Sequence, residues 1–158
     1  MNAKSIAILI SLILITQFVG GVWASFSNPG SEWFESLEKP FFNPPSWVFG
    51  PVWVTLYLFM AISIFRIYNS ITINDFEKYL MYILYALQLV LNSLWTPLFF
   101  LFQEVGLALI NIILLLIVIF YILFKYYKLD TISFYLWIPY VLWVSFATLL
   151  NLSIYLLN

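Results

Sequence analysis

The sequence predicts an all-α integral membrane protein, a bundle of five transmembrane helices with a long structured loop between the first and second helices. Hydrophobic residues make up 65% of the 158-residue chain and charged residues 8%, with a mean hydropathy of +1.03, whereas about a quarter of the residues in a soluble domain are charged. Five apolar stretches are each close to the ~20 residues that a helix needs to cross the hydrocarbon core. No stretch alternates apolar and polar residues over ~10 positions, as the strands of a membrane β-barrel do.

The apolar stretches and their links define one membrane domain over residues 1–158. The expected spans are residues 5–27, 46–68, 79–102, 105–127 and 132–157. The links are residues 28–45, 69–78, 103–104 and 128–131, of which only the first is long. No internal repeat or low-complexity tract interrupts this pattern, so a second domain is not expected.

The first span is expected to remain in the mature chain as a helix. A secretory signal peptide is the alternative, because Lys4 precedes the apolar run and residues 22–24 (VWA) form a permissible cleavage site. The run is long, however, and contains pairs of small residues at a spacing that lets helices approach closely in a membrane. These pairs are Gly20/Ala24 and Gly21/Ser25.

The distribution of basic residues predicts the orientation of the spans. With five spans, the N-terminus and the second and fourth links share one side, which holds five of the six basic residues: Lys4, Arg66, Lys78, Lys125 and Lys128. Only Lys39 is on the other side. Because basic loops tend to stay in the cytoplasm, we expect a cytoplasmic N-terminus, with the long first link and the C-terminus outside. The expected location is a bacterial or archaeal cell membrane.

The residue types that the chain lacks exclude several kinds of chemistry. It has no cysteine and no histidine, which rules out disulfides, thiolate nucleophiles, imidazole bases and the usual zinc and haem-iron ligands. Met60, Met81 or a tyrosine would be weak axial ligands. No metal site and no resident cofactor are expected, and a net charge of −1 gives no sign of nucleic-acid binding.

The long first link has the composition of a stiff aromatic lid. Pro40, Pro44 and Pro45 fix their own φ and bias the preceding residues towards extended conformations. Pro51 falls in the first turn of the second span, where proline is tolerated. The aromatic residues of the segment are Trp33, Phe34, Phe41, Phe42 and Trp47. We expect it to fold over the end of the bundle; for Trp33 and Phe41 the alternative is an aromatic belt at the membrane interface.

Polar and aromatic residues within the spans fall on shared helix faces. These stripes are Trp53 and Tyr57 on the second span, Gln88, Asn92 and Trp95 on the third, and Tyr140, Trp143, Ala147 and Asn151 on the fifth. Hydrogen bonds between helices are one explanation, and the one preferred for Asn111 on the fourth span. Apolar walls with a few convergent polar groups also describe a small-molecule pocket, which is our interpretation of the three stripes together.

Three segments carry a more specific signature. They are WFESLEKPFFNPPSWVFGPVWVTLY at 33–57, QLVLNSLWTPLFF at 88–100 and WIPYVLWVSFATLLNLSIYLLN at 137–158. With the five spans, they resemble the TspO/translocator-protein family (peripheral benzodiazepine receptors, tryptophan-rich sensory proteins) over the whole chain. The departures are Phe34, where the family usually has Tyr, and Phe42, where it often has Trp. No Lys or Arg follows Tyr155, so the cholesterol motif proposed for vertebrate members is absent there.

The resemblance implies a ligand site between the helices below the first loop, in what is usually a homodimer. The implied ligands are porphyrins, haem, sterols and similar lipophilic molecules. Carried over residue by residue, the resemblance implicates Phe34, Pro44, Trp53, Tyr57, Gln88, Asn92, Trp143 and Ala147. Trp47 of the lid, and Trp95, Tyr140 and Asn151 of the stripes, complete the expected ligand-binding set.

Two main functions follow from this resemblance. The first is a membrane receptor or sensor for tetrapyrroles such as protoporphyrin and haem. The second is a carrier that moves sterols, lipids or porphyrins along or across the bilayer, and a scaffold for partner proteins is a further option. No ionisable residue lies deep in a span, which argues against ion-coupled transport. Enzymatic activity stays open: bacterial members degrade protoporphyrin in light with two tryptophans that correspond to Trp53 and Trp143, which would then be catalytic.

Reporters fused to the two ends of the chain test the predicted orientation. We expect a reporter that works only in the cytoplasm to be active at the N-terminus and inactive after Asn158, because five spans place the ends on opposite sides. An export-dependent reporter should show the reverse. Finding both ends on one side would contradict the five-span orientation and would point to cleavage of the first span.

Overall fold

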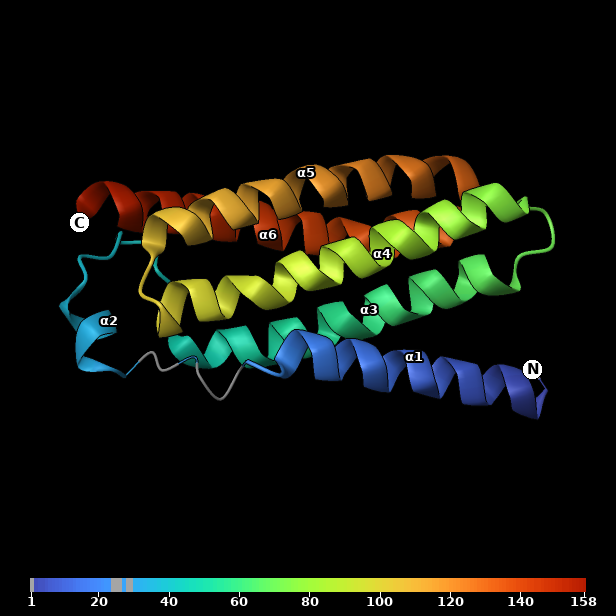
Figure 1. The fold of residues 1–158 in the computed structure, drawn as a ribbon, viewed down its shortest axis with the longest axis horizontal. Helices are drawn as coiled ribbons and strands as arrows, with labels where there is room; N and C mark the ends of the chain where they lie inside the picture. The colour runs from blue at the N-terminus through green and yellow to red at the C-terminus, as the bar shows by residue number, and fades with distance from the viewer. Residues whose placement is uncertain (1, 24–26, 28–29) are drawn as a thin grey trace.

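The computed structural model describes residues 2–23, 27 and 30–158, in which five long helices run side by side (Figure 1). They are α1 (Ala3–Gly21), α3 (Phe49–Asn69), α4 (Asp75–Thr96), α5 (Val105–Leu129) and α6 (Thr131–Leu157). A 3-10 turn, η2 (Ser46–Val48), leads into α3, and a π-helical turn, η3 (Pro97–Leu101), continues α4. Five helices in the described ranges are long and apolar enough to cross a membrane, which confirms the predicted five-span fold.

The observed helix boundaries differ from the expected spans by a few residues. α4 begins at Asp75 because the Asn74 side chain caps it, accepting a hydrogen bond from the N–H of Glu77 at 2.9 Å. An acidic first turn suits the positive end of the helix dipole but gives no hydropathy signal. At the other end of the chain, α1 ends at Gly21. Ala24 and Ser25, which complete the small-residue pairs and the cleavage motif, lie outside the described residues.

The helices form a ring in the order α1, α3, α6, α5, α4, and α3 also packs against α4. The N-terminus and the α3–α4 and α5–α6 links lie at one end, here called the N-terminal end (Figure 1). The short helix α2 (Glu32–Ser36), the α4–α5 turn and the C-terminus lie at the other, here called the loop end. The largest fully buried side chains of the core include Trp137, Tyr126, Tyr140, Phe99 and Met60.

The long first link contains a helix, α2, that the sequence did not predict. Ser31 caps it by accepting a hydrogen bond from the N–H of Phe34 at 3.2 Å, and five residues are too few to show helical periodicity. The rings of Trp33 and Phe34 meet Phe99 edge-on, with centroids 5.6 and 6.3 Å away. Trp33 therefore packs against the bundle.

The middle of the first link is hydrogen-bonded to Asn158, the residue that follows the last turn of α6. The side-chain amide of Asn158 accepts a hydrogen bond from the N–H of Glu38 at 3.0 Å and donates one to its carbonyl at 3.1 Å. Lys39 Nζ donates to two carbonyls at the end of α2 and lies 4.7 Å from the ring centroid of Phe34. Phe41 beyond these contacts is 100% exposed, but the link returns to the bundle at Phe42, whose ring centroid lies 6.2 Å from that of Phe146.

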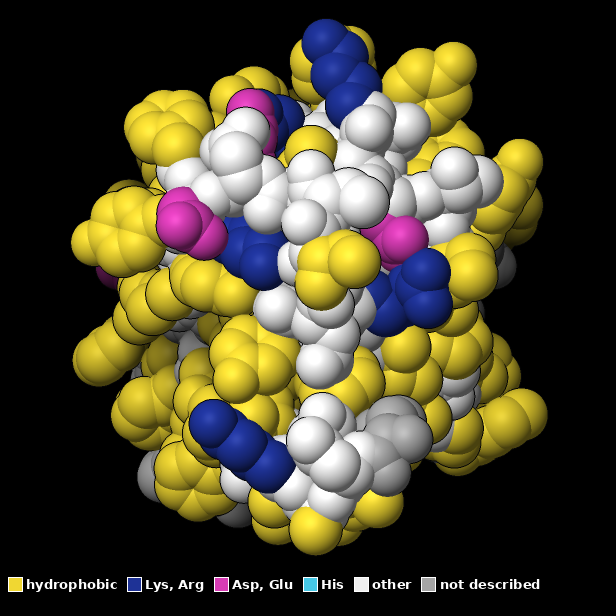
Figure 2. All heavy atoms as spheres, turned by 90° about the vertical axis from the view of Figure 1, so that its right-hand side faces the viewer, with side chains coloured by type: hydrophobic (Ala, Val, Ile, Leu, Met, Phe, Trp, Pro, Cys, Tyr) yellow, Lys and Arg dark blue, Asp and Glu magenta, His cyan; other side chains and the backbone are white. Residues whose placement is uncertain are grey.

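Two ion pairs connect the helices at the N-terminal end, where basic and acidic side chains lie next to one another (Figure 2). Arg66 at the end of α3 donates to Asp130 from Nε at 2.7 Å and from Nη2 at 2.8 Å. Asp130 also caps α6 by accepting a hydrogen bond from the N–H of Ser133 at 2.8 Å. Because a bidentate guanidinium–carboxylate pair is directional, it fixes the α5–α6 link to α3.

The Arg66–Asp130 pair should make stability depend on pH in the acid range. Hydrogen bonds from Arg66 lower the pKa of Asp130 from 3.8 to about 2. A lowered carboxyl pKa stabilises the folded state above the unfolded pKa, so the contribution is complete above about pH 4 and is lost as the pH falls through about 2. In thermal unfolding in detergent across this range, we expect the parent to lose about 1 kcal/mol more than Asp130→Asn.

Asp130→Asn is a suitable comparison because asparagine caps helices as well as aspartate does. It removes the charge and keeps the hydrogen bond to α6. Equal losses of stability in the parent and the variant would show that the ion pair contributes nothing measurable.

Candidate functional site

A cavity of about 440 Å³ lies between the helices towards the loop end, with walls from all five long helices, η3 and the first link. Its volume is within the range of ~300–1,000 Å³ typical of small-molecule pockets. Nine of the twelve predicted ligand-binding residues line it: Phe34, Pro44, Trp53, Tyr57, Asn92, Trp95, Trp143, Ala147 and Asn151. The structure therefore brings the three predicted stripes together around one space.

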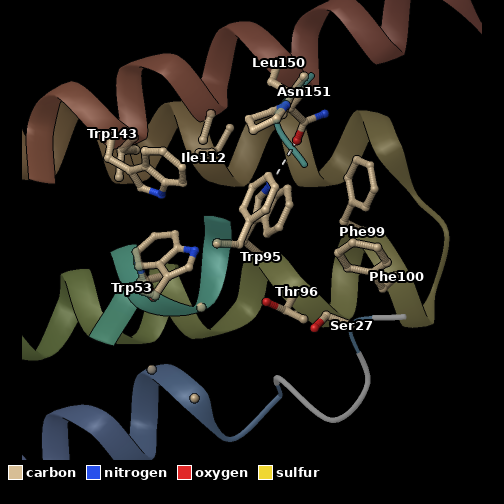
Figure 3. A pocket seen from close by; sticks show the side chains of 18 of the residues that line it. Ser27, Trp53, Trp95, Thr96, Phe99, Phe100, Ile112, Trp143, Leu150 and Asn151 are labelled. Carbon is tan, nitrogen blue, oxygen red and sulfur yellow. Dashed lines mark hydrogen bonds between the residues drawn. The ribbon is translucent and has the colours of Figure 1, made fainter. Parts of the chain in front are cut away.

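Aromatic rings form most of the cavity wall (Figure 3). Trp53 of α3 stacks on Tyr57, with centroids 5.3 Å apart and 24° between the ring planes. Trp95 of α4 stacks on Phe99 at 5.0 Å and 23°. Trp143 of α6 completes the set from a third helix. Because aromatic rings favour stacked and edge-to-face contacts, this wall suits a flat aromatic ligand.

A hydrogen-bond pair holds the wall near the loop end. Trp95 Nε1 donates to Asn151 Oδ1 at 2.9 Å, the dashed line in Figure 3, and Asn151 Nδ2 donates to the carbonyl of Val105 at 3.1 Å. These bonds connect α4, α6 and α5. The hydrogen bond to Asn151 thus fixes the position of the Trp95 indole in the cavity wall.

The floor of the cavity is a chain of buried hydrogen bonds that joins four helices. The Tyr57 hydroxyl lies 2.8 Å from Asn92 Oδ1 and 3.0 Å from the carbonyl of Gly20, and donates to one of them at a time. Asn92 Nδ2 donates to the Tyr140 hydroxyl at 3.1 Å, which donates to Gln88 Oε1 at 2.8 Å. Gln88 and Tyr140 are both 0% exposed. Contrary to the sequence prediction, they do not line the cavity but lie behind the residues that form its floor.

Trp47 is also not placed where the sequence predicts. It belongs to the 3-10 turn η2, and 75% of its surface is exposed. Its neighbours Ser46 and Phe49 line the cavity instead. The sequence shows that Trp47 belongs to the first link, but the geometry of the 3-10 turn determines the direction of its side chain.

The indole N–H of Trp143 is an unused hydrogen-bond donor at the cavity. Its Nε1 atom is buried and has no hydrogen-bond partner among the described residues. In Figure 3, the indole nitrogen of Trp143 lies on the side of its ring that faces Trp53. A buried donor without a partner is unfavourable by roughly 1–3 kcal/mol.

Sequence reasoning did not assign the rings of η3 to the site, and it named Gly20 for close helix packing but not for its contact with Tyr57. Phe99 and Phe100 line the cavity, but they follow Pro97 in a π-helical turn, where the α-helical spacing used to find stripes does not hold. A Cβ at Gly20 would overlap the ring of Tyr57, so only glycine allows the Tyr57 hydroxyl to reach α1. The spacing of small residues in the first span was the available signal.

The remaining polar groups of the site allow binding more readily than acid–base catalysis. No charged side chain is present among the described residues that line the cavity. The cavity therefore offers stacking surfaces, amides and indole donors.

Asn111 donates to the carbonyl of Leu91 at 2.8 Å, which confirms the predicted interhelical hydrogen bond.

Comparison with known proteins then identifies the family, because the sequence profile of the TspO/MBR family matches residues 9–157. The chain belongs to the TspO/MBR family. It is 35% identical over 158 residues to the tryptophan-rich protein TspO of Archaeoglobus fulgidus, covering 100% of this chain and 99% of that one. It is 34% identical over 127 residues to a tryptophan-rich sensory protein of Cereibacter sphaeroides, covering 80% and 77%. The translocator protein of Homo sapiens is 32% identical over 126 residues, covering 80% and 75%.

Family membership confirms the resemblance found in the sequence. Together with the five spans, it supports a role for this TspO/MBR protein as a multi-pass membrane receptor or sensor.

Alanine substitutions at two adjacent glycines test the contact between α1 and Tyr57. Gly20→Ala should destabilise the protein by about 1–3 kcal/mol, as overpacking does, because the new methyl group would displace the Tyr57 ring. Gly21→Ala is the matched control, since a Cβ there meets nothing within 4 Å. Thermal unfolding in detergent measures both. Equal stability of the two variants would contradict the close approach.

Proposed function

We propose that this protein is a membrane receptor that binds protoporphyrin, or a closely related tetrapyrrole, in the cavity and degrades it in light. The observation that carries the proposal is a cavity with tryptophans from three helices, Trp53, Trp95 and Trp143, and no charged residue among its described lining. A flat apolar macrocycle matches such walls, because it can stack on indole faces.

The residues available favour a metal-free ring over haem. The chain has no histidine or cysteine, and neither Met60 nor Met81 lines the cavity. Tyr57 does line it, but its hydroxyl is already hydrogen-bonded within the floor, so haem iron would lack a strong axial ligand.

A porphyrin also carries propionate groups, which a basic side chain could bind. Lys39, the only basic residue at the loop end, has its Nζ 4.7 Å from the ring centroid of Phe34. Because Phe34 lines the cavity, Lys39 is the candidate partner for a propionate.

The proposed orientation places this site towards the outside of the cell. Five of the six basic residues lie on the segments that meet at the N-terminal end, and basic segments tend to remain in the cytoplasm. The cavity is at the opposite, loop end. A ligand on the outer side of the membrane would therefore be the one detected.

The light-driven step uses an indole as a transient electron donor and dioxygen as the oxidant. The excited porphyrin takes one electron from Trp53 or Trp143, giving an indole cation radical and a porphyrin anion radical. Dioxygen adds to a meso carbon of the anion radical, and the electron returns to the indole as the second oxygen atom closes on the neighbouring ring carbon to form a dioxetane. The O–O bond and the C–C bond of the dioxetane then break, so the macrocycle opens with two carbonyl groups and both oxygen atoms end in the product.

Replacement of the two indoles by phenylalanine tests the proposal. Trp53→Phe, Trp143→Phe and the double variant keep an apolar ring but remove the oxidisable indole. We expect protoporphyrin affinity to change only a few-fold, because most of the stacking surface remains, while the loss of protoporphyrin absorbance under light slows strongly. Trp47→Phe is the matched control, since Trp47 is 75% exposed and outside the cavity lining.

Dark and oxygen-free samples provide the remaining controls, because the proposed step needs both light and dioxygen. If the double variant bleaches protoporphyrin as fast as Trp47→Phe does, the catalytic role is refuted and the receptor role alone remains. If the parent protein does not bind protoporphyrin, the proposed ligand is wrong.

A further inference from the structure

A second depression lies on the outside of the bundle between α3 and α6, and we call it the α3–α6 groove. Its surface is apolar. The hydroxyl of Thr55, the one hydroxyl in its described lining, already donates to the carbonyl of Pro51 at 2.9 Å. Leu142, 64% exposed, forms part of its rim. Both helices span the membrane, so the groove faces hydrocarbon and offers a surface for an apolar molecule.

The α3–α6 groove and the cavity share two residues, Pro44 of the first link and Trp143 of α6. The indole of Trp143 contacts one ring on each side. Its centroid lies 5.7 Å from that of Phe49, which lines the cavity, and 5.8 Å from that of Phe146, which lines the groove. Trp143 is therefore the partition between the two spaces.

Trp143 lacks the hydrogen bond that fixes other tryptophans of the bundle. Trp95 Nε1 donates to Asn151 Oδ1 at 2.9 Å, and Trp137 Nε1 donates to the carbonyl of Ile119 at 3.2 Å. Trp143 Nε1 has no such partner among the described residues. Turning this side chain thus breaks ring contacts but no hydrogen bond of the indole.

The backbone of α6 is also weakened next to Trp143. Pro139, one turn before it, lies inside the helix and has no N–H to donate to the carbonyl of Tyr135. Helices bend most readily at such positions. Pro139 itself lines the α3–α6 groove, so the weak point of α6 is at the groove.

We propose that lipophilic ligands reach the cavity sideways from the bilayer, through the α3–α6 groove, with Trp143 as the movable partition. The proposal rests on the proposed function, because it takes the cavity as the destination. From the loop end, a ligand meets the part of the link that is held by Asn158 and by the Trp33 and Phe34 rings. Through the groove, a bilayer-dissolved ligand crosses only apolar surface.

A single cysteine in the cavity measures access directly, because the chain contains no other cysteine. Ala147→Cys places the thiol in the cavity wall, and its reaction with a lipid-soluble maleimide is followed in phosphatidylcholine nanodiscs. Leu142→Trp, added to this variant, fills the groove. Leu149→Trp is the control, since Leu149 is 58% exposed on the same face of α6 but lines neither the groove nor the cavity.

We expect Leu142→Trp to slow the labelling several-fold and Leu149→Trp to leave it unchanged. Equal labelling rates in the two variants would overturn the route. This measurement does not involve a porphyrin, so it decides on the route even if the proposed ligand is wrong.

Protoporphyrin kinetics in the same nanodiscs provide the second readout, through quenching of tryptophan fluorescence. We expect Leu142→Trp to slow association and dissociation by the same factor and to leave Kd unchanged, because a barrier on the path does not alter its end states. Unchanged rates would overturn the route. Absence of binding to the parent would refute the proposed function alone.

Discussion

The bundle depends above all on the buried hydrogen-bond chain that runs from Tyr57 through Asn92 to Tyr140. In hydrocarbon no water replaces a lost partner, and each unsatisfied polar group costs several kcal/mol. The chain therefore fixes how α3, α4 and α6 are rotated relative to one another. Each of its members is three or four residues from a tryptophan of the cavity wall and shares a helix face with it. These pairs are Tyr57/Trp53, Asn92/Trp95 and Tyr140/Trp143.

The sequence predicts the part of the site that lies on regular helices, because helical spacing determines which residues share a face. It does not determine depth along the helix: Gln88 shares a face with Asn92 but lies one turn further from the loop end and is sealed from the cavity. Prediction from α-helical spacing also fails where the backbone is not α-helical. The direction of Trp47 depends on a 3-10 turn, and the place of Phe99 depends on a π-helical turn.

The chemistry of the cavity follows from what a membrane interior permits. Charged groups are costly there, and the described lining has none, so recognition relies on ring surfaces and a few amide and indole groups. Trp143 is an exception among these groups, since its indole N–H is buried without a hydrogen-bond partner among the described residues, and ring contacts with Phe49 and Phe146 hold the side chain.

The amide pair between Asn158 and Glu38 makes the lid and the last helix one mechanical unit. A ligand that lifts the lid must either break two hydrogen bonds or pull on the end of α6. At its far end, α6 begins at Asp130, which Arg66 ties to α3. A pull at the loop end thus acts along α6, which bends most readily at Pro139, so a disturbance of the lid changes the bend of this helix before it reaches the Arg66–Asp130 pair.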